Sequence, residues 1–392
     1  NELYDIFSDT YVWSVDKITD KTAVSEESLH QTKLKKEGEI AYLPGRSIEI
    51  TDADIAELEF VFDAGLDGNI ITGYTGKNKN IRFPAEIDGV KTVGVKLPKT
   101  NNLNNIEMPD GVVTIDFENC PNLETVKLST GLTTIPKSAF YECESLTSID
   151  IPNGVTSIED GAFSRCKALA SVTLPNTLTT IGAGAFSSCG LEQLTIPSSV
   201  TEIGSGAFNY CESLKTVNFP DTPIAFGYNA FSNCIALEEI TLPGGIGDGS
   251  GGEIFAYCNN LKKVTVYRTL SNAKYDATDY RCEDGRVFYL CPSLEEVVLI
   301  STPDSEFIIP SCAFEECSAL KIIDTSKCDN LVLCDAILAD CPSIQTISLP
   351  DNTRPIVNNI NRVTPFYKAN ESLVVTYKGK EYNYTNFNEM FK

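Results

Sequence analysis

One pattern of apolar and polar positions recurs along most of the chain. Each copy opens with Leu-x-x-Ile-x-Ile or a close variant, as in LTSIDIP from Leu146, and continues through a second apolar pair to Ala-Phe and then Cys. Alternation in the first stretch predicts a strand with one buried face. The second pair, Val155 and Ile158 in this copy, predicts a shorter strand or a turn. The Phe position recurs every 22 to 24 residues at Phe117, Phe140, Phe163, Phe186, Phe208, Phe231 and Phe255.

A unit of this length cannot enclose its own apolar side chains, so copies must stack to share one core. Stacking places Phe on Phe and Leu on Leu along the whole array. The sequence therefore predicts a curved leucine-rich-repeat solenoid, in which each copy of about 23 residues supplies a β-strand plus a short second strand or turn. Later copies are less regular, and their Phe position is expected at Phe288, Phe314 and Ile337.

Three segments follow from where the pattern begins and ends. Residues 1–62 do not repeat, and we expect an N-terminal cap or a small separate module there. Residues 63–365 form the repeat array. Residues 366–392 contain VVTYKGKEY, which alternates around Lys378-Gly379 and predicts a C-terminal capping hairpin.

Two further elements are expected in the first segment. SEESLHQTKLKKEG, from Ser25 to Gly38, predicts a short capped helix. GEIAYLPGRSIEIT alternates like paired strands around Pro44-Gly45.

The regular spacing is disturbed twice. The glycine-rich LPGGIGDGSGGEIF, from Leu242 to Phe255, predicts a flexible loop. The next interval, from Phe255 to Phe288, is 33 residues long and predicts an inserted loop. Tyr and Arg are enriched at binding hot spots. The loop residues that could bind a partner are Tyr267, Arg268, Tyr275, Tyr280 and Arg281.

Net charge limits the partners. The 392 residues carry 54 acidic and 31 basic side chains, a formal charge of -23. Nucleic-acid binding needs clustered basic residues, so this balance argues against it. No apolar run is long enough to span a membrane. The chain opens with Asn, which indicates a processed or trimmed product, through removal of an export signal or through a cloning boundary.

Ten of the 14 cysteines follow the Phe position and form a ladder at the repeat period. Free Cys behaves as a small buried hydrophobe, and we expect the ladder to be part of the core. Four cysteines do not follow this spacing, and a disulfide among them is an open alternative: Cys282, Cys312, Cys328 and Cys334.

The sequence contains no recognisable catalytic motif. The single His, His30, lies far from every Cys, and no nucleophile elbow or phosphate loop occurs. TDADIAE and DAGLDGN resemble calcium loops without completing one. We therefore predict no enzymatic activity, no catalytic residue, no cofactor and no metal.

A solenoid offers a concave face lined by the strand residues that point away from the core. These outward positions are expected to be small and polar. The candidates for partner binding are Ser148, Asp150, Ser171, Thr173, Gln193, Thr195, Thr216, Asn218, Glu239 and Thr241.

The repeat motif is LxxIxLPxxVTxIGxxAFxxC, and TIPSSVTEIGSGAFNYC from Thr195 to Cys211 is an example. This motif resembles the BspA-like bacterial surface leucine-rich repeats. The resemblance covers roughly residues 63–350, and VVTYKGKEY is similar to the ending of many such proteins. It implies an extracellular protein displayed on the bacterial cell surface, since proteins of this type are typically exported and some act as adhesins. Together with the missing catalytic motifs, it leads us to predict a non-enzymatic binding or adhesion protein that recognises its partner through the solenoid. Its partners would be proteins or glycans, host extracellular matrix included.

Two other functions stay open. The array could be a structural spacer that displays the N-terminal segment, or, less favoured, a hydrolase with an unrecognised acidic site.

Overall fold

The computed structural model describes residues 14–15, 31–33, 40–43, 46–49, 60–64, 67–74, 76–87, 89–247, 251–270, 285–302, 305–355 and 365–391. The chain divides into two compact units, residues 1–178 (unit 1) and 179–392 (unit 2).

Unit 1 begins with antiparallel pairing. The first strands are β1 (Ser14–Val15), β2 (Gln31–Lys33), β3 (Ile40–Leu43), β4 (Arg46–Glu49) and β5 (Phe60–Ala64). The hairpin predicted around Pro44-Gly45 is present, because β3 pairs antiparallel with β4. The helix predicted from Ser25 to Gly38 is wrong at β2, which pairs antiparallel with β5. Pairing with a neighbouring strand overrides the weak helical preference of this stretch.

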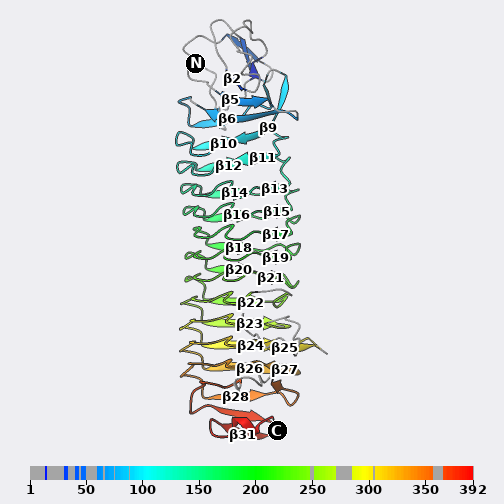
Figure 1. Cartoon of the computed structure of the whole chain (residues 1–392), viewed down its shortest axis with the longest axis vertical. Coiled ribbons are helices and arrows are strands. Elements are labelled where there is room, and N and C mark those ends of the chain that lie inside the picture. Colours follow the sequence, from blue (N-terminus) through cyan, green and yellow to red (C-terminus); the bar gives the residue numbers. More distant parts are fainter. Residues whose placement is uncertain are drawn as a thin grey trace. The chain divides into compact units, whose positions relative to one another are not determined.

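Parallel strands in two columns make up the rest of unit 1 (Figure 1). The first column is β7 (Asn80–Arg82), β10 (Asn105–Glu107), β12 (Thr125–Lys127), β14 (Ser148–Asp150) and β16 (Ser171–Thr173). The second contains β6 (Asn69–Tyr74), β9 (Val90–Lys96), β11 (Thr114–Asp116), β13 (Thr134–Ile135) and β15 (Ser157–Ile158), with β8 (Glu86–Ile87) antiparallel to β9.

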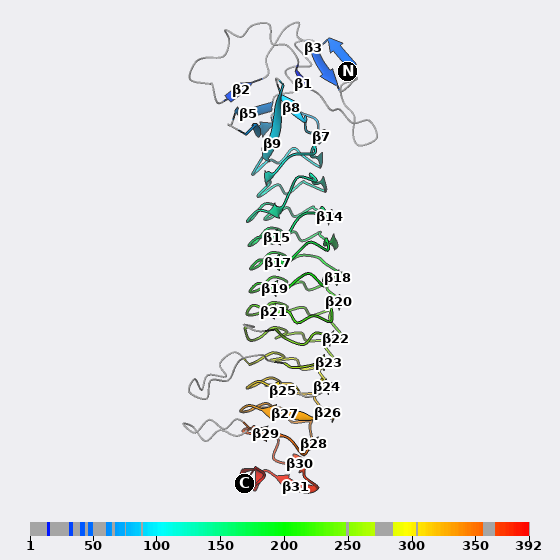
Figure 2. The ribbon, with the colours of Figure 1, turned by 90° about the vertical axis from the view of Figure 1, so that its right-hand side faces the viewer.

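Unit 2 repeats the arrangement, and Figure 2 shows its columns with β19 and β21 on one side and β20 and β22 on the other. The first column is β18 (Gln193–Thr195), β20 (Thr216–Asn218), β22 (Glu239–Leu242), β23 (Lys263–Tyr267), β24 (Glu296–Ile300), β26 (Ile322–Lys327), β28 (Thr346–Leu349) and β30 (Val374–Tyr377). The second is β17 (Thr180–Ile181), β19 (Glu202–Ile203), β21 (Ala225–Phe226), β25 (Glu306–Ile309), β27 (Asn330–Leu333) and β29 (Arg354–Pro355).

The chain closes with the predicted hairpin. β30 pairs antiparallel with β31 (Lys380–Asn383) across Lys378-Gly379, and the short 3-10 helix η3 (Phe387–Glu389) follows. β30 also pairs in parallel with β28, so this hairpin continues the solenoid. That residues 366–392 and residues 1–62 act as caps stays a prediction, as does the curvature of the array.

The core is a column of stacked phenylalanines in each unit. In unit 1 the ring of Phe140 lies 5.7 Å from Phe117 and 5.2 Å from Phe163, with nearly parallel planes. In unit 2 the column runs through Phe186, Phe208, Phe231, Phe255, Phe288 and Phe314, with centroids 4.8 to 5.8 Å apart. Every ring in the two columns is fully buried. The register of the repeat is thus fixed by like-on-like packing.

The Cys ladder adds hydrogen bonds to this packing. The Cys143 thiol donates to the carbonyl of Phe117 at 3.2 Å, and Cys211 donates to Phe186 at 3.2 Å. Burial raises the pKa of Cys211 to about 12, so the thiol stays protonated and remains a donor. The predicted burial is confirmed, and no described cysteine forms a disulfide; Cys282 lies outside the described residues.

One repeat assignment needs correction. Phe314 donates its N–H to the carbonyl of Ile337, as Phe288 does to Ala313, so Ile337 occupies the Ala position. Leu338 takes the Phe position instead, three residues before Cys341. The missing Phe hid the register, because both candidate side chains are apolar.

The glycine-rich stretch is more ordered than expected over its described part. Ile246 is buried and forms a parallel bridge with Ile224 of the preceding turn. A Cβ added at Gly244 would lie 2.1 Å from the carbonyl oxygen of Thr222. The glycine therefore permits close packing between turns.

The described architecture is a parallel β-solenoid of about 12 turns with little helix. The predicted fold class is confirmed.

Candidate functional site

The outward faces of the first-column strands are where the repeat leaves side chains free to vary. Alternation puts the middle residue of each three-residue strand toward the core and its neighbours outward. The predicted outward residues lie where expected, and each is exposed: Ser148, Asp150, Ser171, Thr173, Gln193, Thr195, Thr216, Asn218, Glu239 and Thr241. Their role in binding stays a prediction.

In unit 1, outward polar groups bond to one another across strands. Asn105 donates its side-chain amide to Asn80 at 2.5 Å and accepts a hydrogen bond from the Thr125 hydroxyl at 2.6 Å. These ladders link β7, β10 and β12 in register. These side chains therefore use part of their hydrogen-bonding capacity within the chain itself.

Three charged residues form ion pairs at the next outward position of the same strands, two residues further along the chain. Glu107 lies 2.6 Å from Arg82 and 2.5 Å from Lys127, with its carboxylate almost fully buried beneath them. Burial alone would raise the pKa of Glu107, but the hydrogen bonds from Lys127 and Arg82 outweigh it and lower the pKa. The triad therefore holds the strands together with a fixed negative charge at its centre.

The outward face changes character at β24, β26 and β28 of unit 2. Ile322, at a position where other copies carry a polar or charged residue, is 53% exposed. Val298 and Ile300 on β24 are half-buried on the same face, and Tyr267 on β23 is 38% exposed. Exposed apolar side chains that share one face indicate a contact surface.

A β-bulge lies beside Ile322. The register between β24 and β26 shifts by one residue between the Val298–Asp324 and Ile300–Lys327 pairs. Ser326 donates its backbone N–H to the Asp324 carboxylate at 2.9 Å. Hydrogen bonds from Ser326 lower the pKa of Asp324, which is ionised at neutral pH. Bulges often re-aim side chains next to functional sites.

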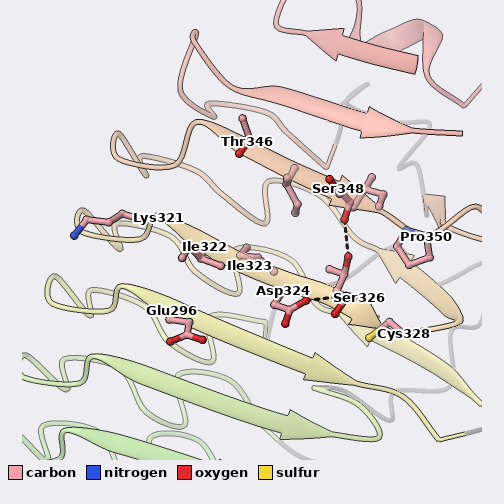
Figure 3. A pocket seen from close by; sticks show the side chains of 13 residues that line it. Glu296, Lys321, Ile322, Ile323, Asp324, Ser326, Cys328, Thr346, Ser348 and Pro350 are labelled. Carbon is pink, nitrogen blue, oxygen red and sulfur yellow. Dashed lines mark hydrogen bonds between the residues drawn. The ribbon is translucent and has the colours of Figure 1, made fainter. Parts of the chain in front are cut away.

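A hollow of about 510 Å³ opens on this face (Figure 3). It lies where the sheets break, because β26 ends one sheet and β28 begins the next. Thr325 bridges the break by donating its hydroxyl to the Ser348 carbonyl at 2.5 Å. The lining residues are Glu296, Lys321, Ile322, Ile323, Asp324, Thr325, Ser326, Cys328, Thr346, Ile347, Ser348, Leu349 and Pro350.

The two carboxylates that line the hollow differ in their ion pairing. Glu296 pairs with Lys263 at 2.9 Å, whereas Asp324 forms no ion pair with any described residue. The carboxylate of Asp324, on the same strand face as the exposed Ile322, is thus held by Ser326 and by no ion pair with a described residue.

The titratable side chains that line the hollow are Glu296, Lys321, Asp324 and Cys328. Burial raises the pKa of Cys328 to about 12, so its thiol is not a nucleophile at neutral pH. None of the described lining residues is a histidine. In the described part of the chain, no group of three His, Cys, Asp or Glu side chains is arranged to hold a metal ion.

The predicted loop residues are only partly described. Tyr267 is the last residue of β23 and sits in the sheet, opposite Ile300, so its assignment to the loop was wrong. Arg268 follows, exposed, in a left-handed conformation with φ of 75°. Tyr275, Tyr280 and Arg281 lie outside the described residues.

Sequence reasoning missed Ile322 and Asp324. The signal was present in ALKIIDT, where the first outward position holds Ile in place of a polar residue. The bulge that turns Asp324 and Ser326 toward each other gives no comparable signal, because it depends on pairing with β24.

Comparison with known proteins identifies the repeat. The model of the BspA type Leucine rich repeat region, in six copies, matches residues 91–213, 181–283 and 284–369. These matches together span well over half of the chain. No protein with a curated description matches. Within the described residues, none of the helical structure is long and apolar enough to cross a lipid bilayer.

Several solved structures are similar. A leucine-rich repeat protein from Bacteroides ovatus has 20% identity and a TM-score of 0.51, over 82% of this chain and 98% of its own. The leucine-rich repeat protein of T. pallidum has 30% identity and a TM-score of 0.42, over 45% of this chain and 87% of its own. A leucine-rich cell surface protein from Faecalibacterium prausnitzii has 23% identity and a TM-score of 0.36, over 84% and 95%. The first of these supports the same fold.

Proposed function

The chain belongs to the BspA-type leucine-rich repeat family, and from that premise we propose that it is an exported, non-enzymatic protein of the bacterial cell surface that binds a protein partner. The contact surface is the outward face of β24, β26 and β28, centred on the hollow beside Ile322. Leucine-rich repeat proteins are generally binding proteins, which supports this reading.

One observation carries the proposal. At the hollow, an exposed Ile322 and the ion-pair-free carboxylate of Asp324 lie side by side, whereas the outward polar groups of β7, β10 and β12 are bonded to one another. An apolar side chain next to an available charge matches the composition of interface hot regions, where a desolvated anchor is flanked by a charge-assisted hydrogen bond.

The chemistry of the hollow favours a protein over a glycan. Sugar rings commonly stack on aromatic side chains, and none of the described residues that line the hollow is aromatic. Ile322 suits an aliphatic or aromatic side chain of the partner, and Asp324 suits a basic or amide group close to it. Host matrix proteins are therefore the first partners to test, with glycans as the alternative.

A structural spacer is the second candidate. The triad of Glu107 with Arg82 and Lys127 uses the outward charges of unit 1 internally, as a stalk would. In that case no partner would engage the hollow.

The test is binding of the full chain to immobilised matrix proteins and to a glycan array, for the wild type, Ile322→Thr and Asp324→Asn. Thr201→Ala, exposed immediately before β19, is the matched control. We expect saturable binding to a protein that weakens about tenfold or more in both hollow variants, since a hydrogen bond to a charged group is worth about 1.5–3 kcal/mol. The control should bind like the wild type.

Two outcomes would overturn the proposal. Equal binding by all four chains would move the contact away from the hollow. Absence of binding to every surface would favour the spacer.

A further inference from the structure

A second surface lies on a different part of unit 2, at the turns that carry the Phe position. Tyrosines recur there: Tyr228 is 46% exposed, and Tyr257 and Tyr289 are half-buried. Tyr257 donates its backbone N–H to the Tyr289 carbonyl at 2.9 Å, so the two lie on adjacent turns. Their rings meet edge to face, with centroids 5.6 Å apart and planes at 80°.

Arg286 joins these rings to carboxylates. Its guanidinium lies 5.0 Å from the centre of the Tyr289 ring and 2.8 Å from the Glu315 carboxylate. Glu253, on the other side, lies 3.9 Å away. The arginine is therefore held in place by three neighbours, and its charge is already neutralised within the chain.

A third carboxylate lies at the edge of the group. Tyr289 donates its hydroxyl to Glu316 at 3.3 Å. Burial, together with the charge of Glu316, raises the pKa of Tyr289, and burial with a hydrogen bond to Glu253 raises that of Tyr228. Both phenols therefore stay protonated. Three glutamates against one arginine leave the tyrosine patch, as we call these seven residues, with a net charge of about -2 at neutral pH.

We propose that the tyrosine patch is a second docking surface, and that its occupant is a protein segment presenting an exposed arginine or lysine. An aromatic face and a nearby carboxylate are the two groups that attract such a cation, by cation–π contact and by ion pairing. None of the seven residues of the patch lines the hollow, so each of the two proposals can be disproved without affecting the other.

Charge complementarity selects this occupant over others. The chain carries a net charge of -23, which repels a second copy of itself and any acidic partner. The same charge steers a basic segment toward the chain before contact. Arg286 is the only cation among the seven residues, and it is already paired with glutamates of the patch. The remaining negative charge of the patch therefore attracts a positively charged group.

The experiment measures binding of a nona-arginine peptide to the full chain, with a nona-citrulline peptide as the uncharged probe. The patch variants are Glu316→Gln and Tyr257→Ala. Glu381→Gln, exposed on β31, removes the same charge elsewhere and is the matched control. Tyr257→Phe keeps the ring and covers the case in which Tyr257→Ala fails to fold.

We expect both patch variants to weaken nona-arginine binding about five- to tenfold at physiological salt, and Tyr257→Phe and Glu381→Gln to change it less than twofold. Nona-citrulline should not bind. Equal losses in Glu381→Gln and Glu316→Gln would reduce the effect to net charge and overturn the proposal. Wild-type affinity in Glu316→Gln would overturn it as well.

Discussion

Two stretches of outward sheet face use the same repeat differently. On β7, β10 and β12 of unit 1, the polar side chains bond to one another, with Glu107 nearly buried between two cations. On β24, β26 and β28 of unit 2, Ile322 is exposed and the carboxylate of Asp324 forms no ion pair with a described residue. The repeat fixes the core, while the outward positions decide whether a turn serves stability or contact.

The comparison requires that the cores of the two stretches be equivalent, and this gives the largest expected effect. Phe140 in unit 1 and Phe288 in unit 2 are both fully buried, and each stacks between two rings. Phe140→Ala and Phe288→Ala should each destabilise their own region by about 3–5 kcal/mol, through lost burial and a cavity. Hydrogen exchange resolved along the chain measures this locally, since repeat arrays need not unfold in two states.

The matched control is an outward substitution in the same strand region, Ser148→Ala in unit 1, which should change protection by less than about 0.5 kcal/mol. A much smaller cost at one of the two phenylalanines would break the comparison. It would show that the two cores differ in stability. Differences between the outward faces could then reflect the cores beneath them.

The second effect contrasts the two carboxylates. Glu107→Gln should destabilise unit 1 by about 2 kcal/mol, because it weakens two charge-assisted hydrogen bonds and leaves Arg82 and Lys127 without their anion. Asp324→Asn should change stability by about 0.5 kcal/mol or less, since its hydrogen-bond partner is Ser326, only two residues away. Denaturant unfolding followed by hydrogen exchange separates the two.

Equal destabilisation by the two substitutions would contradict the contrast. In that case Asp324 would be a structural residue, and its availability to a partner would lose its support. Glu107→Asp serves as the control in unit 1, because it keeps the charge and shortens the reach by one methylene.

The period of the sequence predicted the fold because each repeated position has one physical task. Phe recurs because ring stacks on ring, and Cys recurs because it is small, apolar and able to donate to a Phe carbonyl. The outward residues of regular three-residue strands followed from alternation alone. Ile337 was misplaced by one residue, because the copy that contains it has Leu338 where the others have Phe.

The hollow could not be predicted in the same way. Its bulge depends on how β26 pairs with β24, and its open side depends on the missing ladder between β26 and β28. Neither changes the spacing of apolar residues. β2 was missed for a related reason: its strand is set by pairing with β5, not by its own sequence.

The smallest expected effect is the pH dependence of the triad in unit 1. The pKa of Glu107 in the folded chain is lowered by Lys127 and Arg82, against the opposing effect of burial. The carboxylate thus stabilises the fold fully above its unfolded pKa of about 4.3, and the stabilisation is lost as pH falls through the lower folded value. Hydrogen exchange of β10 and β12, compared between wild type and Glu107→Gln, should show a difference near pH 6 that shrinks toward pH 3. A difference that stayed constant across this range would mean that the glutamine disturbs packing, and that the charge of Glu107 does not hold the strands together.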